Sequence, residues 1–287
     1  MTTYLIVGAS GCLGTALVEE LNSQALSFEI AGRSNPGNIP NFRFLDLTNI
    51  SSLSDFPVQH YDQILYLAQS RKYRCYPDGI QDMLLVNFQA PRILAQIARK
   101  FGIPFIYMST GSVYKSKAFA VKETDEFQPN GSLSLYQVTK LAAEFEFTEF
   151  ENVKVIRPFF VYGKESDTSS LIPTLITKVN KGVPIQLKGK MGLNLNPIHS
   201  MDAARAILHV THQHHKVFNI SGIEETNIFE LGHLIGNLLG IKPTFEVIDI
   251  QEHSILADIG LLLETGFIHG QTLKSGLSNY INSSVLP

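Results

Sequence analysis

The chain has 287 residues, 44% of them hydrophobic, which is enough to bury one large α/β domain or a main domain with a smaller lobe. Its net charge of −3 gives no broad basic field, so we expect no nucleic-acid partner. No apolar stretch reaches the roughly 20 residues of a membrane helix, and no signal sequence precedes the first strand, so we expect a cytoplasmic protein without membrane contact. Cys12 and Cys75 are the only cysteines, which excludes a disulfide framework.

The N-terminal residues predict a nucleotide-binding turn. The apolar run 4–7 is typical of a strand buried on both faces, and it leads directly into a turn with Gly8, Gly11 and Gly14. A helix beginning near Gly11 directs its free N–H groups and positive dipole end toward a pyrophosphate, and glycine lets the phosphate approach the backbone. Three spaced glycines also occur in ordinary strand-to-helix turns. Their position directly after the first strand favours a dinucleotide site.

Apolar runs then alternate with helical patterns, which predicts a doubly wound parallel sheet of the Rossmann type, with an α/β fold. The expected strands are 3–8, 27–32, 42–45, 63–68, 104–109 and 153–158. The expected helices between them include 12–23, 81–101 and 136–150. Ligands of such sheets bind beyond the carboxyl ends of the strands, so we expect the functional residues there.

The regular alternation stops after Pro158, and the remainder predicts a smaller C-terminal substrate lobe. The expected elements are a helix at 170–181, a strand at 183–187, a helix at 201–212 and a strand at 216–220. The last of these strands has the composition of a core strand, so it and the helix before it should return to the main sheet. The expected domains are a dinucleotide-binding domain of residues 1–163 and 201–221, and a substrate-binding lobe of residues 164–200 and 222–287. A substrate would bind in the cleft between them.

Tyr136 and Lys140 are the clearest acid–base candidates. Lys140 follows one helical turn after Tyr136, so the two side chains lie on one helix face. A tyrosine titrates near ~10 in water, but a neighbouring ammonium and a cationic nicotinamide ring would move its pKa toward neutrality. Thr110 follows the strand that ends at Ser109, where its hydroxyl could bind the same reacting oxygen. The alternative is an exposed helix pair without chemistry.

These motifs resemble the extended short-chain dehydrogenase/reductases, the family that includes nucleotide-sugar epimerases and dehydratases, and the resemblance covers almost the whole chain. The matching segments are Gly8-Ala-Ser-Gly11-Cys-Leu-Gly14, Asp46-Leu47, Leu67-Ala68-Gln69, Val86-Asn87, Ser109-Thr110-Gly-Ser-Val-Tyr114, Tyr136-x-x-x-Lys140, Arg157-Pro158-Phe-Phe-Val-Tyr162-Gly163, 197–202 and 218–222. Several are weak alone, but their order and spacing are specific. The resemblance implies that Tyr136 is the general acid/base. It also implies that Lys140 holds the nicotinamide ribose and shifts the tyrosine, and that Thr110 orients the substrate oxygen.

The resemblance also implies an extended site for NADP or NAD. Its expected residues are Gly8, Ser10, Gly11, Cys12, Leu13, Gly14, Arg33, Ser34, Asp46, Leu47, Leu67, Ala68, Gln69, Tyr136, Lys140 and Pro158. A carboxylate at the end of the second strand suits the ribose of NAD, whereas an arginine there suits the extra phosphate of NADP. In this chain Gly32 is followed by Arg33 and Ser34, which favours NADP. A solvated loop arginine is the alternative.

The activity that the resemblance implies is NAD(P)-dependent oxidoreduction or epimerisation at a hydroxyl- or keto-bearing carbon. The favoured substrate is a nucleotide-sugar. Dehydration is disfavoured, because Gly111 and Ser112 replace the acidic pair that follows the catalytic threonine in the dehydratases. Ser112 also replaces the cysteine of the deoxysugar epimerase-reductases. One alternative is an NADPH-dependent reductase of a smaller carbonyl compound, and another is a non-catalytic cofactor sensor. The joint presence of Thr110, Tyr136 and Lys140 favours an enzyme.

Charged residues near the expected cleft predict a small anionic substrate. A guanidinium matches phosphate oxygens in a fork, yet Arg205 is the only arginine after Arg157. Lys188 or Lys190 could act as point charges instead. The loop Arg71-Lys72-Tyr73-Arg74 follows the fourth strand and is a second source of positive charge, with a solvated basic loop as the alternative.

Three further features carry weaker expectations. The one metal-like cluster consists of His209, His212, His214 and His215. It lies near the end of an expected helix and has no partner cysteine, so we expect no metal. Asn87 either supports the site or caps a helix, and we expect a structural role for His199. The sequence leaves open whether the enzyme epimerises or reduces, and whether it is a homodimer.

Overall fold

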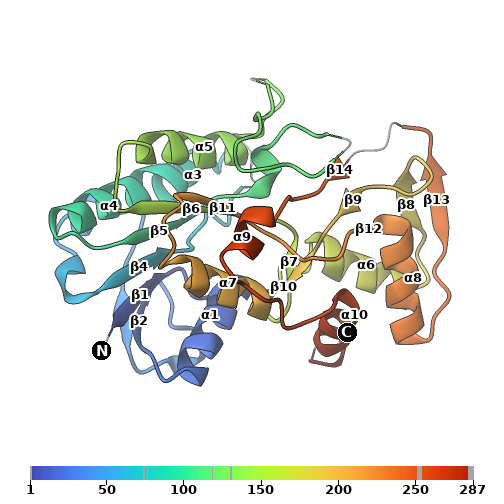
Figure 1. Ribbon diagram of the computed structural model, residues 1–287, viewed down its shortest axis with the longest axis horizontal. Coiled ribbons are helices and arrows are strands. Elements are labelled where there is room, and N and C mark those ends of the chain that lie inside the picture. The colour runs from blue at the N-terminus through green and yellow to red at the C-terminus, as the bar shows by residue number, and fades with distance from the viewer. Residues whose placement is uncertain are drawn as a thin grey trace.

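The computed structural model describes residues 2–73, 75, 77–117, 119–129, 131–250 and 254–283. Its centre is a seven-stranded sheet of parallel neighbours in the order β11-β6-β5-β4-β1-β2-β3 (Figure 1). The strands are β1 (Thr3–Val7), β2 (Ser27–Gly32), β3 (Phe42–Phe44), β4 (Gln63–Tyr66), β5 (Phe105–Met108), β6 (Val153–Pro158) and β11 (Val217–Ile220). Each lies within an expected strand, so the doubly wound parallel sheet is confirmed.

Helices cover both faces of this sheet (Figure 1). On one face lie α3 (Ile80–Leu84), a π-helical turn (Leu85–Gln89), α4 (Ala90–Lys100) and α5 (Leu135–Phe147). On the other lie α1 (Cys12–Ser23) and α7 (Ser200–Val210). Successive residues of β1 enter opposite cores, with Leu5 and Val7 in the first and Tyr4 and Ile6 in the second. Burial on both faces explains why these strands are continuous apolar runs.

The strand order changes direction between β1 and β4, the neighbours from which the chain proceeds to opposite edges of the sheet. At such a point the loops that follow the strands diverge and leave a crevice beyond the carboxyl ends. Further short elements within residues 1–113 are the 3₁₀ turns η1 (Pro36–Asn38), η2 (Val58–His60) and η4 (Gly111–Val113), and the helix α2 (Ile50–Leu53). The fold therefore places the glycine turn after β1 and the segment after β4 on either side of one crevice.

The remaining elements form smaller sheets and helices, at the right of Figure 1 for the most part. They are β7 (Val161–Tyr162), α6 (Leu171–Asn180), β8 (Ile185–Lys188), β9 (Asn194–Leu195), β10 (Ile198–His199), β12 (Thr226–Asn227), α8 (Ile228–Leu239), β13 (Phe245–Ile248), β14 (Ser254–Ile255), α9 (Gly260–Glu264) and α10 (Leu273–Ser283). Strand β8 pairs with β13, and β9 lies between β12 and β14. In the described ranges, no helix combines the length and the apolar character that crossing a membrane requires.

A separate hydrophobic core holds this second part together. Ile176 of α6, Leu187 of β8, Leu231 of α8 and Leu277 of α10 are all buried in it. Helix α9 differs, because its Leu262 packs into the core of the main sheet although it lies in the range assigned to the substrate lobe. We keep the domain boundaries as a proposal, with α9 attached to the main core.

Candidate active site

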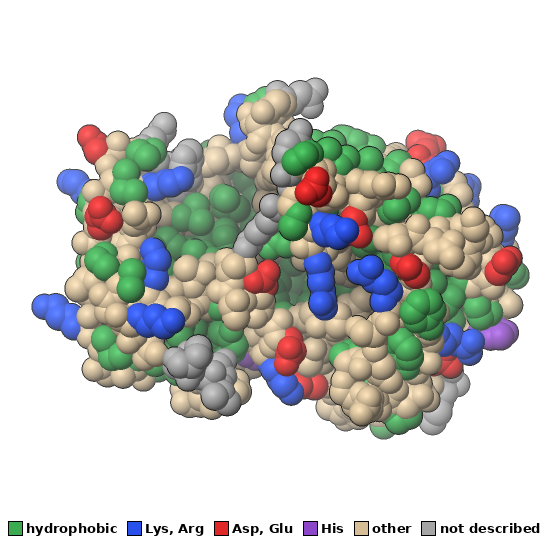
Figure 2. Space-filling view, turned by 180° about the vertical axis from the view of Figure 1, so that it is seen from behind, with side chains coloured by type: hydrophobic (Ala, Val, Ile, Leu, Met, Phe, Trp, Pro, Cys, Tyr) green, Lys and Arg blue, Asp and Glu red, His purple; other side chains and the backbone are tan. Residues whose placement is uncertain are grey.

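A cavity of about 700 Å³ lies beyond the carboxyl ends of the main sheet. Its walls come from the turn after β1, from residues that follow β2, β3, β4 and β5, from α5 and from the segment 161–167. Small-molecule sites commonly enclose about 300–1,000 Å³. Figure 2 shows one hollowed face of the molecule, with lysine and arginine side chains beside the hollow. The cavity lies at the switch point where α/β sheets bind their ligands.

The glycine turn after β1 has the geometry of a phosphate cradle. Gly8 has a φ of +94°, and a Cβ there would lie 2.6 Å from the backbone nitrogen of Ala68. A Cβ on Gly14 would lie 2.5 Å from the Cα of Ala9. Gly11, in contrast, borders open space. It is the N-cap of α1, and because it has no side chain, it cannot bind the free N–H groups of the first turn. The residues at the start of α1 line the cavity, and the unpaired backbone N–H groups of a helix start suit the diphosphate of a dinucleotide.

The cavity lining contains every expected cofactor residue except Lys140. They are Gly8, Ser10, Gly11, Cys12, Leu13, Gly14, Arg33, Ser34, Asp46, Leu47, Leu67, Ala68, Gln69, Tyr136 and Pro158. Hydrogen bonds from the backbone N–H and the hydroxyl of Thr48 lower the pKa of Asp46, and the charge of Arg33 lowers it further. The guanidinium of Arg33, which follows β2, and the carboxylate of Asp46, which follows β3, thus both line the same part of the cavity.

Tyr136 occupies the first turn of α5, which is fixed by a capping box between Ser134 and Gln137. Its phenol donates a hydrogen bond to Oε1 of Gln69 at 3.2 Å. Burial raises the pKa of Tyr136 to about 12, and a hydrogen bond with the side chain of Thr110 partly opposes this rise. The structure therefore brings Thr110 and Tyr136 together on one wall, and both line the cavity.

Lys140 lies beneath this wall and is only 1% exposed. Its Nζ donates a hydrogen bond to the carbonyl oxygen of Met108 at 2.7 Å, and it lies 6.0 Å from the ring centre of Tyr136. Burial lowers the pKa of Lys140 to about 7, while the charge of Glu144 raises it. Burial is thus the largest influence on the Tyr136 pKa, and the expected move toward neutrality, which also invoked a cationic nicotinamide ring, stays a prediction.

The segment after β4 makes contacts that the sequence did not predict. Arg71 Nη2 donates to the hydroxyl of Ser10 in the glycine turn at 3.0 Å. The ring of Tyr73 lies 5.7 Å from the ring of Tyr136, and its hydroxyl lies 3.5 Å from Oδ2 of Asp167. This segment therefore links the glycine turn, α5 and the loop before α6. The sequence signals for this segment were its position after a strand end and its positive charge, and neither specifies these contacts.

Other predicted residues fall in different places. Arg74 lies outside the described residues, and Lys188 and Lys190 are exposed and do not line the cavity. Asn87 is buried in the π-helical turn, where its side chain accepts from the backbone N–H of Ser70 and donates to the hydroxyl of Thr139. These bonds join the loop after β4 to α5, so Asn87 supports the site and does not cap a helix.

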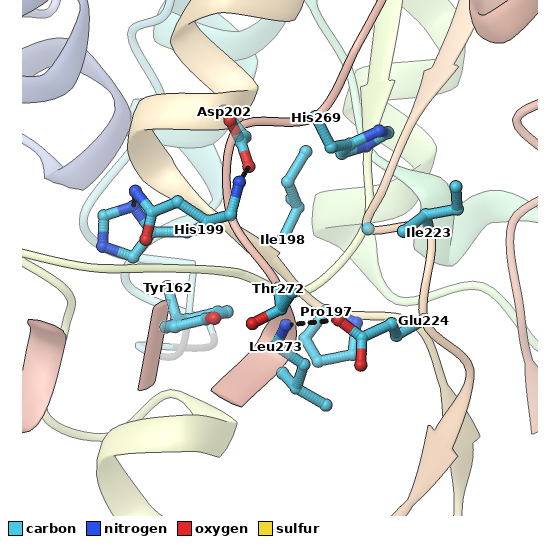
Figure 3. Close-up of a pocket in the computed structure, with 12 residues that line it drawn as sticks. Tyr162, Pro197, Ile198, His199, Asp202, Ile223, Glu224, His269, Thr272 and Leu273 are labelled. Atoms are coloured by element: carbon cyan, nitrogen blue, oxygen red, sulfur yellow. Dashed lines mark hydrogen bonds between the residues drawn. The ribbon is translucent and has the colours of Figure 1, made fainter. Parts of the chain in front are cut away.

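A second pocket, of about 10 Å³, lies where β10, α7 and the start of α10 meet (Figure 3). Asp202 accepts hydrogen bonds there from the backbone N–H groups of Gly270 and Gln271 and pairs with Arg205. His199 accepts from the backbone N–H of Met201 and caps α7. Such a volume suits about one water molecule, so this pocket does not compete as a substrate site.

His209, His212, His214 and His215 lie at the end of α7 and in the segment that follows it. Among the residues described, no three His, Cys, Asp or Glu side chains form a group that could hold a metal ion. His209 Nε2 instead lies 2.8 Å from the hydroxyl of Thr265.

The cavity, the glycine turn and the Tyr136 wall can be compared with known proteins. The model of the NAD dependent epimerase/dehydratase family matches residues 4–221. The chain belongs to this family. An "uncharacterized UDP-glucose epimerase YtcB" of Bacillus subtilis (strain 168) is 25% identical, with 96% of each chain covered. A dTDP-4-dehydro-6-deoxy-D-allose reductase of Streptomyces sp is 26% identical, with 96% of this chain and 94% of the reductase covered.

Solved structures agree at the level of the fold. The UDP-glucuronic acid 4-epimerase from Bacillus cereus, in complex with UDP-glucuronic acid and NAD, has a TM-score of 0.82 and 22% identity, with 98% of each chain covered. The family match confirms the resemblance and the expectation of an NAD(P)-dependent enzyme of the extended short-chain dehydrogenase/reductase type. The family description and this structure name NAD, and neither supports a preference for NADP.

Proposed function

We propose that this member of the family is an epimerase or reductase that acts on a hydroxyl- or keto-bearing carbon of a nucleotide-sugar. The observation that carries the proposal is the position of the Tyr136 phenol, within reach of Thr110, on the wall of the cavity that also holds the glycine turn. The relatives at 25% and 26% identity are named for a UDP-sugar epimerase and a dTDP-sugar reductase, which supports a nucleotide-sugar substrate. In both reactions a hydride moves to or from this carbon, and a proton moves to or from the oxygen bonded to it.

The residues of the chain divide this work. The glycine turn and the start of α1 hold the diphosphate, and Thr110 and Tyr136 bind the reacting oxygen. A bound nicotinamide supplies hydride exchange with the substrate carbon. Tyr136 gives its proton to a carbonyl oxygen during reduction and receives it from a hydroxyl during oxidation. In its charged form, Lys140 stabilises the phenolate that results.

A substrate screen tests the proposal. The purified protein is incubated with UDP-glucose, UDP-glucuronic acid, a dTDP-4-keto-6-deoxy sugar and simple ketones, in the presence of NAD, NADP or their reduced forms. We expect conversion of at least one nucleotide-sugar. An epimerase leaves the cofactor unchanged overall, whereas a reductase consumes one reduced cofactor per product. Conversion of small ketones alone, or cofactor binding without any conversion, would replace this proposal with one of the two alternatives.

A finer proposal is that Arg33 selects NADP. Replacing Arg33 with Ala should weaken NADP binding by about 1.5–3 kcal/mol, because a charge-assisted bond to the extra phosphate is lost, and should hardly change NAD binding. Calorimetric titration of both cofactors measures this. Equal losses for the two cofactors, or a native preference for NAD, would assign Arg33 to the solvated loop instead.

The proposed substrate is anionic, and Arg71 is the described cation of the loop after β4 that lines the cavity. Arg71→Ala should raise KM several-fold and reduce the dependence of KM on salt, because screening weakens a charge contact that is present only in the parent. The neighbouring Lys72 is exposed and does not line the cavity, so Lys72→Ala is the matched control. An unchanged KM in Arg71→Ala at both low and high salt would remove Arg71 from the site.

Activity should fall as the pH rises through the pKa of Lys140. Burial lowers this pKa to about 7, so the charged form that stabilises the phenolate is lost from the free enzyme above that value. The profile of kcat/KM against pH reports groups of the free enzyme and measures this alkaline limb. A first loss of activity only near pH 12, where Tyr136 titrates, would show that the charge of Lys140 is not needed.

A further inference from the structure

A buried ion pair lies one helical turn beyond Lys140, and the chemistry proposed above does not use it. Glu144 of α5 is 6% exposed and Arg157 of β6 is 4% exposed. Arg157 Nη2 lies 2.5 Å from Oε2 of Glu144, and Arg157 Nε lies 3.1 Å from the same oxygen. Apolar residues of similar volume often stabilise a core as well as such a pair does, because burying two charges is costly. Stability alone is therefore a weak reason for this pair.

The second oxygen of Glu144 binds the end of strand β5. Oε1 of Glu144 accepts a hydrogen bond from the hydroxyl of Ser109, which is itself 3% exposed. The preceding residue, Met108, receives the hydrogen bond of Lys140 through its carbonyl oxygen. Two consecutive residues at the end of β5 are thus bound by two side chains one turn apart on α5. The next residue of the chain is Thr110.

The same helix face carries the proposed acid/base. Tyr136, Lys140 and Glu144 follow one another at intervals of one turn, so they lie in a row along α5. The two bonds to β5 hold this row against the strand end and limit both sliding and rotation of the helix. The distance between the Thr110 hydroxyl and the Tyr136 phenol depends on that alignment. A misplacement of about 1 Å can lower a catalytic rate by roughly 10²-fold.

Arg157 fixes the carboxylate that makes the contact. Its Nη1 donates to the phenol of Tyr114 and to the carbonyl oxygen of Glu123, the latter at 3.0 Å. Tyr114 in turn donates to the side chain of Asn219 on β11 at 2.8 Å. The guanidinium is therefore held from three sides, and Glu144 has little freedom to move away from Ser109.

We propose that Glu144 is a positioning residue of the active site, which fixes the Ser109–Thr110 end of β5 against the helix that carries Tyr136. The inference rests on the proposed function, because it assumes that Thr110 and Tyr136 bind the reacting oxygen. Glu144 does not touch the cavity itself, so it acts through Ser109. Loss of this contact should slow the chemical step and leave cofactor binding unchanged.

The charge of Glu144 provides a readout that a purely structural role would not change. The groups that face Lys140 Nζ in the described structure are Glu144 and Tyr136 on its own helix, and the Tyr107 ring and the Met108 carbonyl on β5. The anionic Glu144 favours the charged form of Lys140. Removing that charge should therefore move the alkaline limb of the activity profile to lower pH.

Three variants test the proposal with the substrate that turns over in the screen. Ser109→Ala removes the contact to β5 and no charge, and Glu144→Gln removes the charge while keeping the shape. Glu146→Gln is the matched control, because Glu146 lies on the same helix and pairs with Arg92 at 2.7 Å, away from β5. We measure kcat, KM, cofactor affinity, thermal unfolding and the pH profile of each. The parent and Tyr136→Phe are measured alongside.

We expect kcat to fall several-fold in Ser109→Ala and about 10-fold or more in Glu144→Gln, with cofactor affinity unchanged in both. Only Glu144→Gln should move the alkaline limb, and Glu146→Gln should match the parent. The proposal is overturned if Ser109→Ala stays within about two-fold of the parent, or if Glu146→Gln loses as much as Glu144→Gln. If Glu144→Gln does not fold, Ser109→Ala decides alone. An active Tyr136→Phe would refute the proposed function instead, whatever the other variants do.

Discussion

Replacing Tyr136 with Phe should lower turnover roughly 10²–10⁴-fold, the range for loss of a positioned acid/base group, while the fold and cofactor affinity are retained. Phenylalanine keeps the ring that packs against Tyr73 and removes only the hydroxyl that contacts Gln69 and Thr110. The measurements are steady-state turnover of the substrate found in the screen, cofactor titration and circular dichroism.

Tyr66→Phe is the matched control for this change. Tyr66 is fully buried in β4, and its hydroxyl donates to the carbonyl oxygen of Val86 at 2.6 Å. Its loss should cost about 1 kcal/mol of unfolding free energy and leave turnover nearly unchanged. Turnover of Tyr136→Phe within a few-fold of the parent, in a protein of intact structure, would defeat the assignment of Tyr136.

The second large effect is expected at Gly8. An alanine there must adopt a φ of +94° and place its Cβ 2.6 Å from the backbone nitrogen of Ala68, which cannot yield as a flexible side chain would. Backbone strain and overpacking each cost about 1–3 kcal/mol, so Gly8→Ala should lose about 2–6 kcal/mol of unfolding free energy and its cofactor site. Urea unfolding and cofactor titration measure the two losses.

Gly11→Ala separates the two consequences of a methyl group in this turn. Its Cβ would meet nothing within 4 Å, so the unfolding free energy should stay that of the parent. Gly11 lines the cavity at the start of α1, where the methyl group would occupy the approach of the diphosphate and weaken cofactor binding. The geometry of the cradle would be contradicted if Gly8→Ala were as stable as the parent, or if Gly11→Ala unfolded as easily as Gly8→Ala.

The sheet was predictable because its signals are local. Strands buried on both faces are continuous apolar runs, and β2 (Ser27–Gly32) and β6 (Val153–Pro158) have the predicted bounds. The packing of helix α9 was not predictable in this way, because its Leu262 packs into the main core through contacts between residues distant in the sequence. No periodicity within α9 specifies which of two cores receives its apolar face.

The lining of the site was predictable for the same reason, and its internal contacts were not. The glycine turn and the strand ends follow from backbone rules, so their residues could be placed at the cavity from the sequence. The spacing of Tyr136 and Lys140 gave a shared helix face, but not that the amine would bind the Met108 carbonyl below the cavity wall. The spacing of Glu144 extends the same row, yet its bond to Ser109 depends on the packing of α5 against β5.

The central claim is that hydride and proton exchange take place in the cavity, at a substrate carbon and its oxygen held between the glycine turn and Tyr136. Isotope transfer tests this claim most directly. UDP-glucose or UDP-glucuronic acid, deuterated at the carbon that bears the reacting hydroxyl, is incubated with the parent and with Tyr136→Phe, both loaded with oxidised cofactor. For a reductase, the label starts on the reduced nicotinamide and is followed into the product of a dTDP-4-keto-6-deoxy sugar. In the parent, we predict transfer of deuterium between the substrate carbon and the nicotinamide. In Tyr136→Phe, we predict that the rate of this transfer is lower by roughly 10²–10⁴-fold. Product formation without label transfer, or equal transfer in both proteins, would contradict the account.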